Sequence, residues 1–490
     1  MKSGGHALAV LEFSRVTDLV AGCASSAAGA ARTRELQPLA AAGDVIAEHA
    51  RVEAMRAIVS GEAGWTPEAI PDLAAALVRL RVEGTAWTAV ELRGAVTLLV
   101  SSRRAAAAIA AARDDSAAQD VTAPLATLAA ALIRDTATER EIDRVVSEDA
   151  VVRDDASPAL RRIRKELRGA TGDLVRMLER LMAKLDDNHR VDDASVTMRN
   201  GRYVIPVRRE GRGAVGGIVH DSSASGSTVF VEPPAAVEAS NRIRELEAEE
   251  LRETERILLE LTDTLRPHRE AFVATLDALV VLDSLYARAR YAIEFGCAPV
   301  SLAAADCGFS IRDGRHPLLL ARDRSAVVPF DLTMEQGERT LLVSGPNTGG
   351  KTVLLKALAL ISLMAQSGIP APVGAGSTIA LFDIFFADIG DEQSIEASLS
   401  TFSAHLRNLT EIIRDATARS LVLIDELGSG TDPVEGAALG GAILESLTRR
   451  GTTTVATTHL GALKELAHEV PGVVNASLQF DAVALAPTFR

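Results

Sequence analysis

The chain has 490 residues, enough for about three or four domains of the usual size. Hydrophobic residues make up 47% and aromatic residues only 3%, so the core must rest on Ala, Leu and Val, which favours packed helices over a β-sandwich. A net charge of −14 argues against a protein whose whole surface binds nucleic acid. Three cysteines without CxxC spacing argue against a zinc site.

Residues 1–155 are predicted to form a helical core domain. Near its start, Glu12, Arg15 and Asp18 interrupt what would otherwise be an apolar signal region. No run of about 18 uninterrupted apolar residues occurs later in the chain. We therefore expect a cytoplasmic protein that has no membrane segment.

Residues 156–194 are predicted to contain one long helix. Ser157 is a suitable N-cap, and Pro158 then occupies the first helical position. Apolar side chains follow at helical spacing from Leu160 to Leu185. The pattern predicts that the helix continues to about Asp187.

Residues 195–234 are predicted to form a small β-rich segment. Two apolar runs, Tyr203 to Val207 and Thr228 to Val231, are separated by glycines. The pair Pro233-Pro234 ends the second run.

Residues 235–300 are predicted to form a second long helix, which Pro267 kinks or divides. Its apolar side chains fall on strict sevens at Leu251, Leu258, Leu265, Phe272, Leu279, Tyr286 and Ile293. Such a stripe fits an arm made of two packed helices and equally fits a helical hairpin for protein dimerisation. Both alternatives remain open at this point.

Basic residues are concentrated between Arg153 and Arg212. This segment contains 15 Lys and Arg and 10 Asp and Glu, which gives a local charge of +5. Two dense groups contain Arg161, Arg162, Arg164, Lys165 and Arg168, then Arg199, Arg202, Arg208, Arg209 and Arg212. Such a patch can follow a phosphate backbone. The alternative is a solvated helix face and an ordinary strand edge.

A phosphate-binding loop is predicted at residues 341–352, where the apolar run Leu341 to Val343 feeds a glycine-rich turn. The spacing GxxxxGK[ST] is completed by Gly345, Gly350, Lys351 and Thr352, around Pro346, Asn347, Thr348 and Gly349. Backbone N–H groups and a helix N-terminus hold phosphate oxygens in such loops. Lys351 is expected to reach the β and γ phosphates and Thr352 to bind Mg²⁺.

Two adjacent acids, Asp425 and Glu426, end the apolar run of SLVLIDELGSGTD. A carboxylate in that position is costly unless a cation uses it. We expect Asp425 to hold Mg²⁺ and Glu426 to orient or polarise the attacking water.

Three further segments are candidates for the same site. His459 ends the apolar run Thr452 to Thr458 and is expected to bond the γ-phosphate or the attacking water. Pro329 and Phe330 precede the loop strand and either flank a nucleotide base or belong to the core. Spacing alone assigns no role to residues 391–393 or 400–402.

The chain resembles the MutS-like ATPases, and within them the bacterial MutS-two branch. GPNTGGKT, DIGDEQSI, SLSTF, LVLIDELGSGTDP and TTHL occur in the family's order over residues 310–490. RNGRYVIPV and HDSSASGSTVFVEP carry the likeness upstream more weakly, and LEFSRVTDLV does so faintly.

The resemblance implies a mixed fold: a mainly α-helical N-terminal core, lever helices with a small β-rich clamp, and an α/β ABC-type P-loop ATPase domain at residues 301–490. It also implies a homodimer with each ATP between two subunits. Ser400 and Thr401 would then touch the γ-phosphate held by the other chain, and Gly428 to Asp432 would link the two sites. Asn347 would lie beside the phosphates and Gln393 near the metal.

Two targets follow from the resemblance. One is branched DNA, through whose binding the family suppresses homologous recombination; the other is rRNA in a collided ribosome, which the family is thought to split for rescue. A transport motor is disfavoured because the signature reads SLSTF rather than LSGGQ. A hinge that binds ATP without cleaving it would need Glu426 to be misplaced.

Two family activities are not expected of these residues. The chain opens without the Phe-x-Glu segment that mismatch-repair relatives insert beside a mispair. It ends at Arg490, soon after the ATPase motifs, whereas MutS-two proteins continue into an Smr nuclease domain.

Overall fold

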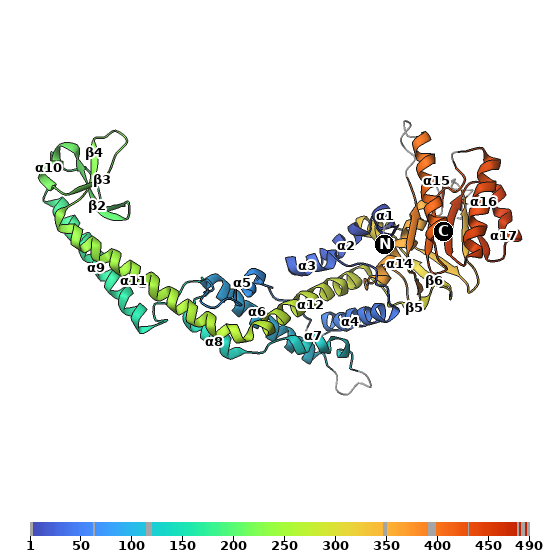
Figure 1. Ribbon diagram of the computed structural model, residues 1–490, viewed down its shortest axis with the longest axis horizontal. Coiled ribbons are helices and arrows are strands. Elements are labelled where there is room, and N and C mark those ends of the chain that lie inside the picture. Colours follow the sequence, from blue (N-terminus) through green and yellow to red (C-terminus); the bar gives the residue numbers. More distant parts are fainter. Residues whose placement is uncertain are drawn as a thin grey trace. The chain divides into compact units, whose positions relative to one another are not determined.

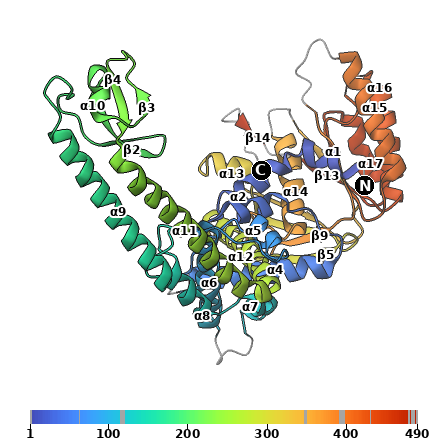
Figure 2. The ribbon, with the colours of Figure 1, turned by 60° about the vertical axis from the view of Figure 1, so that its left-hand side comes forward.

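The computed structural model describes residues 3–61, 64–113, 120–345, 350–390, 398–429, 431–477, 480–481 and 486–487. The chain forms two compact units (Figures 1 and 2). The sheet unit consists of Met1–Ile70, Ser101–Leu132 and Thr275–Arg490, and the arm unit of Pro71–Val100 and Ile133–Ala274. The five segments predicted from the sequence remain a prediction, whereas the mixed α/β class is confirmed.

A five-stranded parallel sheet, in the order β10-β11-β12-β8-β13, is the centre of the sheet unit. Its strands are β8 (Thr340–Ser344), β10 (Phe385–Asp388), β11 (Leu421–Ile424), β12 (Thr453–Thr458) and β13 (Val473–Ser477). Strands β8, β10, β11 and β12 are buried throughout, which explains why apolar side chains do not alternate with exposed polar ones along them.

Helices cover both faces of this sheet. Because successive strand side chains point to opposite faces, Leu341 packs in one core cluster and Leu342 in another. Leu355 of α14 belongs to the first cluster, and Ile412 of α15 and Ile443 of α16 to the second. These helices are α14 (Lys351–Gln366), α15 (Ser398–Asp415) and α16 (Pro433–Arg449).

The remaining elements of the sheet unit surround this core. A second sheet has the order β5-β9-β6-β7, with β5 (Ser301–Ala304), β6 (Phe309–Gly314), β7 (Phe330–Met334) and β9 (Thr378–Leu381). The other elements are α1 (Ser3–Val10), α2 (Phe13–Ala21), α3 (Ala27–Arg34), α4 (Ala42–Ser60), α7 (Ala126–Ala131), α13 (Pro317–Arg322), α17 (Leu466–Glu469), β14 (Phe480–Asp481) and β15 (Ala486–Pro487). Phe13 and Val16 share a core cluster with Leu341, so the N-terminal helices pack with the sheet.

Two long helices, α9 (Pro158–Ala183) and α11 (Pro234–Leu265), run side by side in the arm unit (Figures 1 and 2). Ser157 caps α9 by accepting a hydrogen bond from the Leu160 N–H at 3.0 Å, as predicted. The shorter helices are α5 (Ala74–Arg79), α8 (Thr136–Val145) and α10 (Arg212–Val215), and α6 (Ala89–Ala111) begins here.

A four-stranded sheet packs on these two helices. Its order is β1-β2-β4-β3, with β1 (Thr197–Arg199), β2 (Arg202–Arg208), β3 (Ile218–Ser222) and β4 (Thr228–Glu232). The turn Asn200-Gly201 has positive φ at both residues, as a tight β1–β2 hairpin requires. Ile205 and Val231 pack against Leu178 of α9 and Ile243 of α11.

The second long helix is divided at Pro267, as predicted. Helix α11 ends at Leu265, a 3₁₀ turn covers Arg266–His268, and α12 (Arg269–Phe295) follows. The predicted sevenfold stripe is wrong at both ends, because Leu251 is 60% exposed and Ile293 is 43% exposed. Apolar spacing predicts a helix face but does not say how far a partner covers it.

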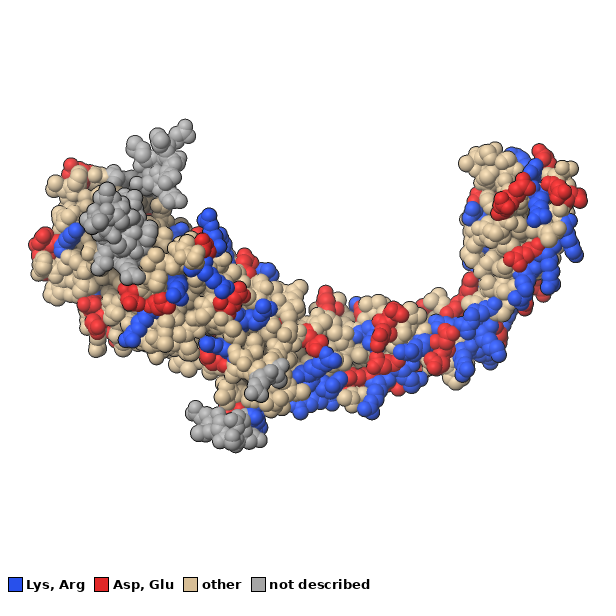
Figure 3. All heavy atoms as spheres, turned by 180° about the vertical axis from the view of Figure 1, so that it is seen from behind, with Lys and Arg blue, Asp and Glu red and all other residues tan. Residues whose placement is uncertain are grey.

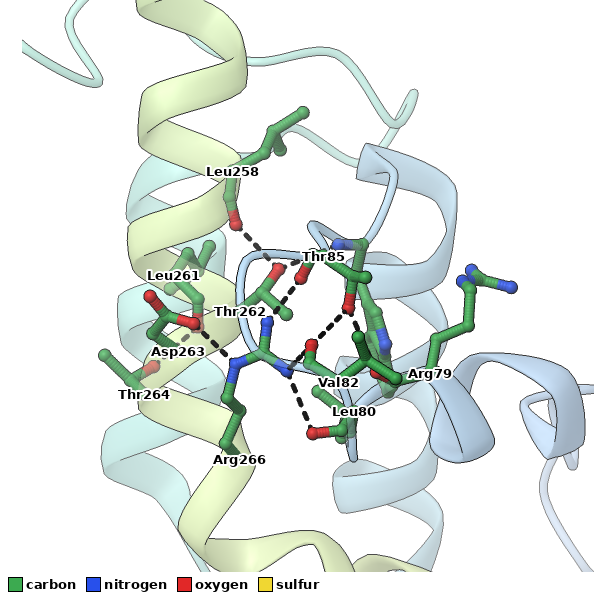
Figure 4. Close-up of polar contacts among 11 residues, drawn as sticks. Arg79, Leu80, Val82, Thr85, Leu258, Leu261, Thr262, Asp263, Thr264 and Arg266 are labelled. Atoms are coloured by element: carbon green, nitrogen blue, oxygen red, sulfur yellow. Dashed lines mark hydrogen bonds and ion pairs between the residues drawn. The ribbon is translucent and has the colours of Figure 1, made fainter.

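Arg266 secures this joint (Figure 4). Its guanidinium donates hydrogen bonds to the carbonyl oxygens of Leu80, Val82 and Thr85 at 2.9, 2.6 and 2.5 Å. It also bonds Asp263 on the preceding turn. No helix of the described residues is long and apolar enough to cross a membrane.

Candidate nucleotide-binding site

The predicted site lies at the carboxyl edge of the five-stranded sheet. Strand β12 pairs with β8 on one side and with β11 on the other, in parallel. Residues that follow these strands therefore come together although they are far apart in sequence. The predicted groups after β8, β11 and β12 meet at this edge.

The predicted phosphate-binding loop leaves β8 at Gly345 and enters α14 at Gly350, both with positive φ. Lys351 is only 3% exposed, and its ammonium donates a hydrogen bond to the Gly345 carbonyl oxygen. Burial lowers the pKa of Lys351, while the charges of Glu426 and Asp425 act in the opposite direction. Pro346, Asn347, Thr348 and Gly349 lie outside the described residues.

The two predicted metal ligands that the structure describes are in direct contact. The Thr352 hydroxyl donates to Asp425 Oδ2 at 2.6 Å, and the Thr457 hydroxyl donates to Asp425 Oδ1. Asp425 is 9% exposed, so its carboxylate needs such compensation. A hydroxyl beside a buried carboxylate is the oxygen donor set that Mg²⁺ accepts, and these residues fit the ion. Gln393, the third predicted ligand, lies outside the described residues.

Glu426 has an unusual backbone. Its φ is +50°, a left-handed conformation that is strained for a residue with a side chain. Its N–H donates to Thr457 Oγ1 at 2.8 Å, so Thr457 contacts both members of the acid pair. No role was predicted for Thr457. The signal was present in the TTHL motif, whose first threonine lies beside the acid pair on the neighbouring strand.

The structure describes the remaining predicted site residues to different extents. His459 follows β12 at the same edge and is exposed. Ser400 and Thr401 lie near the start of α15, where only the backbone is described. Beyond Glu426, Gly428 has a φ of +85°, and Asp432 caps α16 by accepting from the Val434 N–H at 2.9 Å.

A cavity of about 720 Å³ opens beside Gly350, at the end of the predicted phosphate-binding loop. Its walls include Val343 of β8 and Leu354 of α14, together with Pro329 and Phe330, so both residues proposed to flank a base line this cavity. The cavity is large enough for a nucleoside. Its walls are mostly apolar, as recognition of a planar base requires.

His316 is a polar residue in the cavity wall that was not predicted. It is 8% exposed, and its Nδ1 has no hydrogen-bond partner within the described residues. Burial lowers the pKa of His316 to about 4, helped by the charge of Lys356. The imidazole is therefore neutral at pH 7.

Comparison with known proteins agrees with this geometry. A family model described as MutS domain V matches residues 341–489, which contain all the predicted nucleotide motifs. Endonuclease MutS2 of Gemmatimonas aurantiaca is 63% identical over 485 residues, which is 99% of this chain and 59% of that protein. Endonuclease MutS2 of Pelotomaculum thermopropionicum is 41% identical over 489 residues, covering 99% of this chain and 60% of that protein.

The likeness runs through both units and is not confined to the sheet. Endonuclease MutS2 of Geobacillus thermodenitrificans is 40% identical over 485 residues, again 99% of this chain and 61% of that protein. The chain spans about three fifths of the length of these relatives. The chain belongs to the MutS family, in the branch of the proteins named Endonuclease MutS2, as its motifs predicted.

Proposed function

We propose that this chain binds ATP with Mg²⁺ and hydrolyses it at the carboxyl edge of the five-stranded sheet. One observation carries the proposal: Lys351, Thr352, Asp425 and Glu426 converge beside a cavity of nucleoside size. Structural residues have little reason to combine a buried ammonium, a buried carboxylate and a strained glutamate at one helix N-terminus.

Each residue has a separate task in this proposal. Lys351 and the N–H groups at the start of α14 bind phosphate oxygens. Thr352 and Asp425 hold the metal ion, which when bound neutralises phosphate charge. Glu426 accepts a hydrogen bond from a water molecule and aims one of its lone pairs at the terminal phosphorus. Thr457 fixes the backbone from which Glu426 reaches that water.

The cavity beside the loop is the proposed place of the base. Val343 and Leu354 offer apolar walls, and His316 adds one neutral polar edge. A base bound in this cavity places the phosphates of the nucleotide at Gly350 and Lys351. His459, exposed at the same edge, is proposed to contact the terminal phosphate or the attacking water.

We also propose a homodimer in which the start of α15 completes the partner's site. Family membership supports this arrangement, and the partly exposed loop Thr431 to Asp432 beyond the acid pair is consistent with a link between sites. In this proposal α9 and α11 are levers, and the β1–β4 sheet is a clamp that closes on structured DNA.

The ion pairs of the arm unit indicate which of its basic side chains are best placed to contact DNA. Six of the ten basic residues in the two dense groups are paired with carboxylates: Arg162, Arg164, Arg168, Arg199, Arg202 and Arg208. Figure 3 shows Lys and Arg interleaved with Asp and Glu on the face of the arm unit that it draws. Arg161, Lys165, Arg209 and Arg212 are exposed, without an ion pair to any described residue. They are the cations best placed to meet phosphates.

Branched DNA is the target that we propose, because the relatives carry the name of an endonuclease. No feature of the arm unit favours rRNA over DNA, since phosphate contacts read neither sugar nor sequence. The ribosome therefore enters only as a second ligand in tests of binding.

Replacement of Glu426 by Gln tests hydrolysis. We expect turnover to fall at least about 100-fold while ATP affinity changes little, because the amide keeps the shape but cannot accept a water proton or polarise the nucleophile as well. Steady-state phosphate release and equilibrium binding of a fluorescent ATP analogue measure the two effects. Glu465→Gln, an exposed glutamate of the same unit, is the matched control. Wild-type turnover in the Glu426→Gln protein would remove the proposed catalytic carboxylate.

A further inference from the structure

Asp388 is a buried carboxylate for which the predicted site has no use. It is the last residue of β10 and is 8% exposed. Its carbonyl oxygen accepts a hydrogen bond from the Asp425 N–H at 2.9 Å, so it lies directly beside the acid pair. A buried carboxylate is costly unless a cation or hydrogen-bond donors compensate it.

The compensation comes from helix α15. Asn408 Nδ2 donates to Asp388 Oδ1 at 3.1 Å, and His405 Nδ1 lies within ion-pair distance of Oδ2. Residues three apart share one face of a helix, so both side chains reach the same strand end. Oδ2 is buried and accepts no hydrogen bond from any described residue, so the nearby imidazole is the polar group that faces it.

His405 also faces the loop that follows Glu426. Together with Leu427, Gly428 and Ser429 it lines a narrow cavity between α15 and α16. Three segments therefore meet at this histidine: the end of β10, helix α15 and the loop behind the acid pair. Thr401 lies one turn before His405, about 6 Å along the helix axis.

We propose that Asp388, His405 and Asn408 form a positioning lock that fixes the start of α15 relative to the ends of β10 and β11. The inference rests on the proposed function, in which the start of α15 acts on ATP bound by the partner chain. Asp388 itself touches no nucleotide. It acts through α15, and its backbone bond to Asp425 ties that helix to the chain's own metal ligand.

Loss of the positioning lock is expected to lower the rate of ATP turnover and to leave ATP affinity almost unchanged. ATP binds to Lys351 and Thr352 of one chain, which the lock does not contact. Misplacement of a reacting group by about 1 Å can cost about 100-fold in rate. We therefore expect His405→Ala to lower turnover by about 10-fold to 100-fold, with less than about a 3-fold change in ATP affinity.

Mixed dimers separate this role from a merely structural one. Wild-type chain is combined with an excess of Lys351→Ala chain, so that nearly every dimer able to bind ATP contains one binding site, served by α15 of the Lys351→Ala chain. His405→Ala is then placed in either chain. We expect the whole decrease of about 10-fold to 100-fold when it is in the Lys351→Ala chain and little decrease when it is in the ATP-binding chain. Glu411→Gln, exposed on the same helix, is the control and should have no effect.

A milder variant guards against a folding defect. If His405→Ala no longer melts cooperatively, His405→Gln keeps a donor toward Asp388 and should lose about 3-fold to 10-fold from the same chain. Equal losses from either chain, or none, would overturn the positioning lock alone. A wild-type chain without ATP turnover would overturn the proposed function and this inference with it.

Discussion

At the scale of single residues, Glu426 combines a chemical role with a conformational cost. Its φ of +50° departs from the extended backbone of β11, and its N–H donates a hydrogen bond to Thr457 in that conformation. Strain of this kind typically costs about 1–3 kcal/mol and persists where the surroundings enforce it. The site therefore stores strain at the residue proposed to orient water.

Two replacements separate strain from chemistry. Glu426→Gly and Glu426→Ala both remove the carboxylate, so both should lose turnover. Glycine adopts positive φ at no steric cost, whereas alanine does not, so we expect the glycine protein to be more stable than the alanine protein by about 1 kcal/mol. Urea unfolding of the two proteins gives the difference. Equal stability, or a more stable alanine protein, would mean that the backbone at this residue is not strained.

His316 is the second residue whose environment has a measurable consequence. Burial in the fold lowers its pKa from the ordinary value of 6.5 to about 4. A histidine with a depressed pKa is neutral in both states above pH 6.5 and costs nothing there. As the pH falls below 6.5 the unfolded chain takes up the proton first, so stability is lost until the folded protein also titrates near pH 4.

His316→Gln should flatten this pH dependence. Between pH 7 and pH 5 the wild type is expected to lose about 2 kcal/mol more than the variant. Trp65 lies in the sheet unit against Tyr286, and Trp87 is the other tryptophan, so Trp65 fluorescence in a Trp87→Phe background reports on the relevant unit. Identical losses in the two proteins would show that another group titrates. The matched control is His468→Gln, an exposed histidine of the same unit.

Site residues that belong to one local motif could be predicted from the sequence. Lys351 and Thr352 belong to one loop, and Asp425 and Glu426 end one strand, so spacing alone predicted them. Asp388, His316 and Thr457 act through neighbours distant in the chain. Their roles depend on strand order and on burial, which no local spacing records.

At the scale of elements, the joint between α11 and α12 has one feature that the sequence predicted and two that it did not. Pro267 cannot donate a backbone hydrogen bond inside a helix, so the division there was predictable. The exposure of Leu251 was not, because a helical stripe does not identify the partner that covers it. Arg266 was not identified either, although it binds three carbonyl groups of one loop.

Arg266→Ala should loosen this joint. The loss of charge-assisted hydrogen bonds to three carbonyl groups is expected to destabilise the arm unit by about 2–3 kcal/mol. The backbone N–H of Trp87 donates to Thr262 of α11 at 2.9 Å, so Trp87 fluorescence follows unfolding next to the joint. Arg266→Lys keeps the charge without the planar fork and should be intermediate. An unfolding midpoint equal to the wild type would contradict the assigned role.

At the scale of the whole molecule, the net charge of −14 conceals local differences. Ion pairs hold six of the ten basic side chains in the two dense groups of the arm unit, whereas Arg209 and Arg212 are exposed and have no ion pair to a described residue. The proposed account joins these cations to the nucleotide edge: ATP bound at Lys351 controls how the arm units of a dimer grip DNA. The mixed α/β class was predictable from motifs and composition, whereas this pairing of charges was not.

The most direct test is ATP-dependent binding of the Glu426→Gln protein to a four-way DNA junction and, in parallel, to stalled ribosomes, over a range of salt concentrations. We expect ATP to increase junction affinity at least about 10-fold. Arg209→Ala with Arg212→Ala should weaken binding and reduce the slope of log affinity against log salt by about 2, since each lost phosphate contact removes about 0.9. Arg208→Ala, whose residue is paired with Asp192, should change the slope less. Junction binding that ignores ATP, or ATP-dependent binding to ribosomes alone, would contradict the account.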